Sequence, residues 1–286
     1  MQPFDTACLL VTCRDRPGLI AAITAYIAEH AGNIVRADQH TDHDTGEFFM
    51  RVEVTRESLR SGREAFAAGL ARVAEPLGMQ CRLEWADRPK RVALLVSKED
   101  HCLSDLLWRW KAGELPCEVA MVVSNHTTAA PPVEMVGLPF HHLPVSPETK
   151  HRQEEQLLAL LDEAEIDLIV LARYMQILSP QVVQRYPGRI INIHHSFLPA
   201  FAGARPYHRA HERGVKVIGA TSHYVTEDLD EGPIISQTTV PVDHRHTVRD
   251  LIRTGRDLER LVLAKAVRLH LEDRVLIAGN KTVVFD

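Results

Sequence analysis

The sequence is poor in the features that mark secreted, membrane-spanning or zinc-clamped proteins. Its 286 residues include five cysteines, an odd number, and none of them forms a Cys-x-x-Cys pair. A disulfide framework and a cysteine-rich zinc site are therefore not expected. No apolar run approaches the roughly 20 residues that a membrane-spanning helix needs, and the N-terminus lacks the basic-then-apolar layout of a secretory signal. We expect a cytoplasmic protein with no membrane partner.

The charged residues give no sign of a nucleic-acid partner. The net charge is −5, and acidic and basic residues are interleaved along the chain. No basic patch is therefore expected for nucleic acid or for an anionic membrane. The apolar content of 45% and the charged content of 25% are ordinary for a globular protein, and the length is sufficient for two domains.

Several catalytic signatures are also missing. Without a Gly-x-Gly-x-x-Gly fingerprint, a nicotinamide or flavin cofactor is not expected, and without a Gly-x-Ser-x-Gly elbow neither is a serine nucleophile. His194, His195 and His223 could in principle bind a metal, but their spacing fits no zinc motif and His-Glu-x-x-His is absent. We therefore expect no cofactor and no metal.

Residues 1–86 have the pattern of a ferredoxin-like βαββαβ unit. A turn at residues 15–18 separates the first strand from the first helix, which Gly32 is expected to end as a C-cap glycine. The predicted strands are residues 7–13, a strand opening at 33–35, 47–54 and 79–85, and the predicted helices are 19–31 and 58–77.

After a polar linker at residues 87–90, strands alternate with helices through residues 91–286. This order predicts a mostly parallel sheet with helices on both faces. The predicted strands are residues 91–97, 118–124, 140–143, 167–171, 191–194, 218–225, 232–239 and 281–285. The predicted helices are 102–113, 148–165 and 248–271, and the stretch 126–138, with two prolines, is predicted as a loop.

The most informative residues lie at the ends of apolar strands of this second domain. Asn192 and His194 end one strand, and an acidic turn containing Asp230 precedes another. Ligands bind beyond the carboxyl ends of parallel strands. An amide donor, an imidazole and a carboxylate at one sheet edge can polarise a carbonyl and activate a nucleophile. By strand alternation, His195 is expected to face away from Asn192 and His194, and either to have a structural role or to support the site residues indirectly.

These motifs resemble a known family. Asn192-Ile-His194 followed by Ser-Phe-Leu-Pro, together with Asp230-Glu-Gly-Pro-Ile-Ile, is similar to the Asn-x-His…Asp signature of folate-dependent formyltransferases. The resemblance runs from about Leu9 to Phe285. It implies a Rossmann-like catalytic domain of the α/β class, with 10-formyltetrahydrofolate as a substrate and not a cofactor.

The resemblance also implies roles for particular residues. Asn192 would donate to the oxyanion, His194 would exchange protons, and Asp230 would orient a water molecule. The substrate-binding residues it implies are Tyr174, Met175, Gln176, Ile177, Leu178, His223, Thr226, Glu227 and Asp228.

The stretch 97–105 bears on the formyl acceptor. Glycinamide-ribonucleotide formyltransferases have a Gly-Ser-Asn-type turn here that cradles a phosphate, whereas this stretch has no glycine and contains Glu99 and Asp100. It resembles instead the deformylases of the family, which give the formyl group to water and release formate for purine synthesis and one-carbon balance. Two alternatives stay open: transfer to an amine such as glycinamide ribonucleotide or an amino sugar, and a non-catalytic folate or amino-acid sensor.

The first domain resembles ACT domains, which commonly pair and bind amino acids at the interface. The resemblance implies a homo-oligomer and an effector site that includes Asp15, Gly18 and Asn33. A plain β-to-α turn is the alternative explanation of residues 15–18, since proline and glycine suit turns in any case.

Overall fold

The computed structural model describes residues 6–55, 62–86, 88–199 and 206–286, and the chain divides into two compact units. The first unit is Met1–Pro89 with Asp273–Ala278 and Val283–Asp286, and the second is Lys90–Glu272 with Gly279–Thr282. The sequence placed all of residues 91–286 in the second domain, so the structure differs at the C-terminal end. Within the described ranges, no helix is long and apolar enough to cross a membrane.

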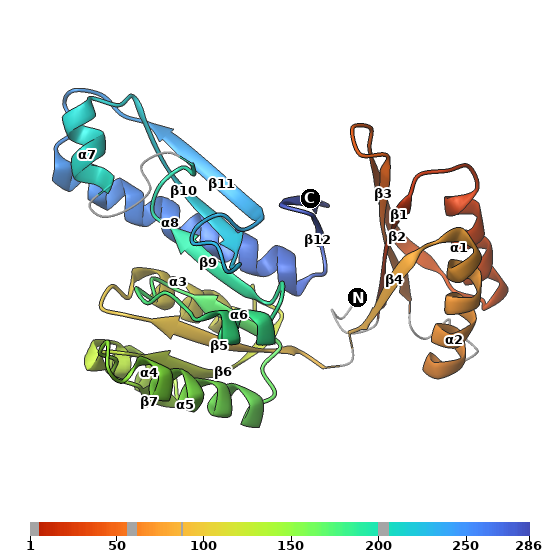
Figure 1. Cartoon of the computed structure of the whole chain (residues 1–286), viewed down its shortest axis with the longest axis horizontal. Coiled ribbons are helices and arrows are strands. Elements are labelled where there is room, and N and C mark those ends of the chain that lie inside the picture. The colour runs from red at the N-terminus through yellow and green to blue at the C-terminus, as the bar shows by residue number, and fades with distance from the viewer. Residues whose placement is uncertain (1–5, 56–61, 87, 200–205) are drawn as a thin grey trace. The chain divides into compact units, whose positions relative to one another are not determined.

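The first unit is an antiparallel sheet with two helices, as the sequence predicts (Figure 1). The strands pair in the order β2-β3-β1-β4, and every pairing is antiparallel. Its elements are β1 (Thr6–Arg14), α1 (Leu19–Glu29), β2 (Ile34–Asp42), β3 (Glu47–Thr55), α2 (Arg63–Ala74), the 3₁₀ turn η2 (Glu75–Leu77) and β4 (Gln80–Trp85). The ferredoxin-like prediction is confirmed.

The two central strands of this sheet, β1 and β3, have buried side chains on both faces. Because side chains alternate along β1, Leu9 packs with Ile23 of α1 on one face, whereas Leu10 packs on the other. The second face is covered by Leu276 and Phe285 from the C-terminal residues of this unit. The first of these lies in β12 (Val275–Ala278), a strand the sequence did not predict, which pairs with β13 (Lys281–Val284).

The two helices of the first unit end differently from the prediction. The residue with left-handed backbone after α1 is Ala31, with φ 60°, and the N–H of Gly32 donates to the carbonyl of Ile27 at 2.8 Å. This is the hydrogen bonding of a Schellman cap with alanine in the usual glycine position. The predicted second helix tightens into a 3₁₀ turn at Pro76, which has no N–H to continue an α-helix. Residues 58–61 of that prediction lie outside the described residues.

The second unit is built on a seven-stranded sheet in the order β11-β10-β9-β8-β5-β6-β7 (Figure 1). Its strands are β5 (Lys90–Val96), β6 (Cys117–Ser124), β7 (Phe140–His142), β8 (Leu168–Leu171), β9 (Ile190–His194), β10 (Val217–Tyr224) and β11 (Ile234–Pro241). The pairings from β9 to β7 are parallel, and β10 pairs antiparallel with both β9 and β11. The mostly parallel sheet is confirmed.

Helices cover both faces of this sheet. The helices are α3 (His101–Lys111), α4 (Ala130–Met135), α5 (Lys150–Glu163), α6 (Pro180–Arg185), α7 (Pro206–Arg213) and α8 (Val248–Leu271). Leu157 of α5 and Val182 of α6 pack on one face of β5, β8 and β9. The helix α8 packs against α3 and lies along β9, β10 and β11. Its start matches the prediction because Thr247 and Asp250 form a reciprocal capping box.

The loop prediction for residues 126–138 is wrong. A 3₁₀ turn, η3 (Thr127–Ala129), leads into α4, whose two prolines lie in the first helical turn. Proline is tolerated there because the first N–H groups of a helix have no intrahelical partner. The short helices α6 and α7 were not predicted either, and α6 likewise begins with a proline.

Candidate active site

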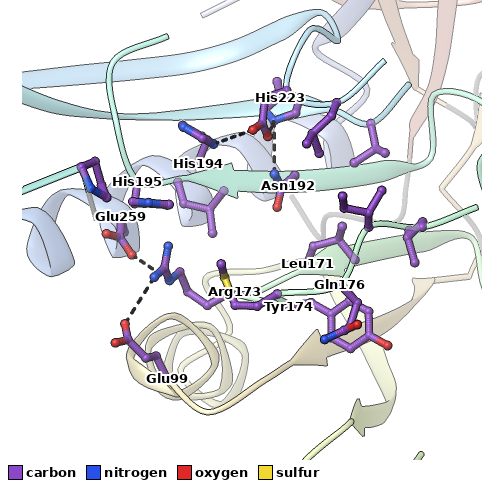
Figure 2. A pocket seen from close by; sticks show the side chains of 18 of the residues that line it. Glu99, Leu171, Arg173, Tyr174, Gln176, Asn192, His194, His195, His223 and Glu259 are labelled. Atoms are coloured by element: carbon purple, nitrogen blue, oxygen red, sulfur yellow. Dashed lines mark hydrogen bonds and ion pairs between the residues drawn. The ribbon is translucent and has the colours of Figure 1, made fainter. Parts of the chain in front are cut away.

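The antiparallel pairing of β9 with β10 places Asn192 opposite His223. The Nδ1 of His223 lies 2.9 Å from the Tyr224 carbonyl, which can only accept, so Nδ1 carries the proton. In the neutral ring, Nε2 then accepts from the Asn192 amide at 3.2 Å (Figure 2). This orients the amide nitrogen of Asn192 and leaves its second N–H for a ligand.

His194 and Asp230 form the second pair of the site. Asp230 Oδ2 lies 3.2 Å from His194 Nδ1, and Asp230 Oδ1 lies 3.7 Å from His223 Nε2. The hydrogen bond from His194, and then the proximity of His223, hold the pKa of Asp230 well below its usual range, although partial burial opposes this. The other ring nitrogen, His194 Nε2, is buried without a hydrogen-bond partner among the described residues. It is the atom of this pair available to a ligand.

The close approach of two backbone segments explains why a glycine, Gly232, follows Asp230 and Glu231. A Cβ at position 232 would lie 1.9 Å from the carbonyl oxygen of Tyr224, at the end of β10. Only glycine lets the turn pass the strand this closely. Asp230 itself has a φ of 59°, a left-handed conformation that is uncommon for residues other than glycine and recurs at functional sites.

A pocket of about 540 Å³ opens beside these residues, a size suited to a small-molecule ligand. Asn192, His194 and Asp230 line it, together with every residue predicted to bind substrate. Those residues are Tyr174, Met175, Gln176, Ile177, Leu178, His223, Thr226, Glu227 and Asp228. Apolar side chains such as Met175, 59% exposed, offer surface to a flat ring. Tyr174 is buried, and its hydroxyl accepts from Gln153 Nε2 at 3.2 Å, which fixes the loop that follows β8.

The sequence reasoning missed a buried charged group at another part of the pocket. Glu259 of α8 is 1% exposed and accepts hydrogen bonds from Tyr207 at 2.7 Å and His101 at 2.8 Å. Burial opposes its ionisation, but the hydrogen bond from His101 and the charge of Arg173 outweigh this and lower its pKa. Burial, and then Glu259, raise the pKa of Tyr207. A glutamate on the apolar stripe beside Leu258 was a signal for such a group.

The prediction that His195 faces away from the site is wrong. The strand β9 ends at His194, so alternation no longer applies, and His195 lines the pocket. Its ring stacks on that of His194 with centroids 5.0 Å apart. Burial, and then the charges of Arg173 and His194, lower the pKa of His195 to about 4. His195 is therefore neutral at pH 7.

The predicted effector residues lie in the first unit. Asp15, Gly18 and Asn33 are all exposed. Gly18 precedes α1 with a φ of 96°, which explains why glycine is there. The backbone of Asp15 donates to Gly46, and that of Asn33 accepts from Thr55.

Within the described part of the chain, one group of side chains has the spacing of metal ligands. It consists of His101, Cys102 and Glu259, whose ligand atoms lie within 4.8 Å of one another. The Glu259 carboxylate is already hydrogen-bonded to His101, and the Arg173 guanidinium lies 3.4 Å away. Burial raises the pKa of Cys102, which disfavours the thiolate a metal needs. These charges and protonation states disfavour a cation there.

Comparison with known proteins agrees with this geometry. The Formyl transferase family matches residues 90–267, and the ACT domain family matches residues 9–68. A formyltetrahydrofolate deformylase of Synechocystis is 54% identical over 280 residues, which cover 98% of each chain. The chain belongs to the formyltetrahydrofolate deformylase family.

Solved structures separate this family from the related transferases. The crystal structure of a formyltetrahydrofolate deformylase from Pseudomonas syringae is 47% identical, covers 98% of this chain and 94% of its own, and has a TM-score of 0.96. Glycinamide ribonucleotide transformylase 1 from Symbiobacterium toebii is 34% identical, covers 69% of this chain and 95% of its own, and has a TM-score of 0.65. The deformylase resembles this chain over nearly its whole length, and the transformylase over about two thirds.

Proposed function

We propose that this protein hydrolyses 10-formyltetrahydrofolate to tetrahydrofolate and formate. The observation that best supports the proposal is the convergence of an oriented amide, Asn192, with the His194–Asp230 pair in one pocket. The family relationship provides the substrate class, and no serine or cysteine nucleophile is needed if water attacks directly.

In the proposed reaction, a water molecule held by Asp230 attacks the formyl carbon. The second amide N–H of Asn192 donates to the carbonyl oxygen as it becomes an oxyanion. A carboxylate with a lowered pKa is ionised at neutral pH, so Asp230 can accept a hydrogen bond from the water.

Collapse of the tetrahedral intermediate completes the reaction. His194, whose Nε2 is free of protein partners within the described structure, delivers a proton to N10 as the C–N bond breaks. One C–O bond forms, one C–N bond breaks, and the proton lost by water replaces the one given to N10. Asp230 receives the first proton of the attacking water and, through its contact with His194, restores the proton that His194 gave to N10. The second proton of the water goes to solvent, and formate leaves as an anion.

The deciding experiment is formate release from 10-formyltetrahydrofolate without any added amine. Rapid release that amines do not enhance supports hydrolysis. Release that requires an amine would make the protein a transferase, and folate binding without turnover would make it a sensor.

We also propose that the first unit binds an amino-acid effector through Asp15, Gly18 and Asn33 and pairs with a second copy. The ACT match and the exposure of these residues support this. A solution mass above that of the 32.1 kDa monomer is expected by light scattering, and a strictly monomeric mass would contradict pairing. In an amino-acid screen, Asn33→Ala should abolish the response of formate release to the effector.

A further inference from the structure

One part of the catalytic pocket is lined by two arginines and two glutamates: Glu99, Arg173, Arg256 and Glu259. Figure 2 shows Arg173 between Glu99 and Glu259, below His194 and His195. The proposed hydrolysis uses none of these four side chains. Their formal charges cancel, so this part of the pocket has no net charge to offer a ligand.

The group has an inner and an outer ion pair. The inner pair is Arg173 with Glu259, at 3.4 Å, with side chains 12% and 1% exposed. The outer pair is Glu99 with Arg256, in which Glu99 Oε1 lies 3.3 Å from the guanidinium. Glu99 Oε2 also lies 3.5 Å from Arg173, so Glu99 links the two pairs. Glu99 and Arg256 are 43% and 48% exposed. Glu99 is therefore the member that could be replaced by an anion from solvent.

Two guanidinium groups that converge on one set of oxygens form a geometry that also binds phosphate. In this protein the oxygens belong to Glu99. We infer that Glu99 acts as a built-in counter-anion, which occupies a latent phosphate site in the pocket and so disfavours phosphorylated amine acceptors. This inference rests on the proposed function, and it makes Glu99 a residue that determines specificity for water.

Hydrogen bonds of Ser97, two residues before Glu99, hold the backbone segment that carries Glu99. The N–H of Ser97 donates to the Arg173 carbonyl at 3.2 Å, and the Ser97 hydroxyl accepts from Met175 N at 2.9 Å. Arg173 itself has a left-handed backbone with a φ of 65°. These contacts tie the segment before α3 to the loop after β8. A tethered carboxylate acts at a high effective concentration, which free anions must exceed to displace it.

The alternative is that Glu99 forms only surface ion pairs. Exposed pairs contribute little to stability, so removing Glu99 would then change nothing at the pocket. The two explanations differ in what happens to the released arginines. If Glu99 occupies a latent phosphate site, removing Glu99 leaves one excess positive charge in the pocket and two arginines that can bind phosphate.

The test is binding of inorganic phosphate to the full-length, folate-free protein by titration calorimetry. Glu99→Gln should bind phosphate at least about tenfold more tightly than the wild type, because two charge-assisted contacts become available. Asp257→Asn is the matched control: it removes the same charge from the residue that follows Arg256 in α8 and releases Arg260, and neither Asp257 nor Arg260 lines the catalytic pocket. Asp257→Asn should bind phosphate as the wild type does.

Two further measurements sharpen the test. Glu99→Gln combined with Arg256→Gln should lose the gained phosphate binding. In formate-release assays, phosphate should inhibit Glu99→Gln and leave Asp257→Asn unaffected. Equal phosphate affinity in the two single variants would overturn the inference, and Glu99→Ser gives the same comparison if Glu99→Gln fails to fold. Calorimetry needs no turnover, so a wild type that releases no formate would refute the proposed function separately.

Discussion

Replacing Asp230 with asparagine tests the proposed chemistry most directly. Asparagine keeps the shape of the side chain and removes the negative charge that faces His194 at 3.2 Å and His223 at 3.7 Å. Asp230 is only partly buried, so the exchange should not unfold the protein. The variant should lose the water-orienting and proton-accepting group while the apolar walls of the pocket stay in place.

The expected loss follows from the role of a positioned acid–base group. Such groups typically contribute about 10²–10⁴ in rate, or about 3–5 kcal/mol of transition-state stabilisation. We therefore expect kcat for formate release to fall by about that factor in Asp230→Asn. The KM should change by less than about threefold, because an interaction made only in the transition state affects kcat.

The assay couples formate release to formate dehydrogenase and measures folate binding separately with tetrahydrofolate. Asp228→Asn is the matched comparison, since it removes the same charge from the same loop at an exposed position. Its effect should be confined to KM. A near-wild-type kcat in Asp230→Asn would refute the role of Asp230. Because the pKa of Asp230 is lowered, its carboxylate stays ionised even somewhat below the ordinary pKa of an aspartate. The contribution of this carboxylate to formate release should therefore be lost only in more strongly acidic conditions.

Three further outcomes are expected. Asn192→Ala should lower kcat by about 10²–10³ with little change in KM, the usual loss for one oxyanion donor, and an unchanged kcat would exclude that role. Gly255→Ala would place a Cβ 2.0 Å from the Tyr207 hydroxyl, so it should destabilise the protein by about 1–3 kcal/mol in urea unfolding, and an unchanged midpoint would contradict this packing. His195 has a pKa of about 4 in the folded protein, against an ordinary value of 6.5. Between these two pH values the unfolded chain binds more protons than the folded protein. The free energy of unfolding of the wild type should therefore fall by up to about 3 kcal/mol as the pH drops through this range. His195→Gln should lack that acid-side loss, and parallel pH profiles of unfolding for the two proteins would show that His195 is not buried as a neutral ring.

Much of the fold follows from local patterns in the sequence. Period-2 and period-3.6 spacing of apolar residues gave the βαββαβ unit, the parallel sheet and α8, whose capping box fixes its start. Local patterns failed where proline was read only as a helix breaker, as in α4, or where alanine replaced glycine in a helix cap, as at Ala31. In α4 proline fits the backbone of a first helical turn, and at position 31 alanine adopts the left-handed backbone that glycine usually provides.

The candidate site divides in the same way. Asn192 and His194 are two residues apart on one strand, and the Asp230 turn has a distinct motif, so the sequence by itself determined this set and, through the resemblance, the family. Only the tertiary structure brought Glu99, Arg173, Arg256 and Glu259 to one pocket, turned His195 into it, and covered the first sheet with the C-terminal residues. Periodicity is a property of neighbours along the chain. Which distant charges share a buried space is decided by strand order and helix packing, and no short stretch of sequence contains that information.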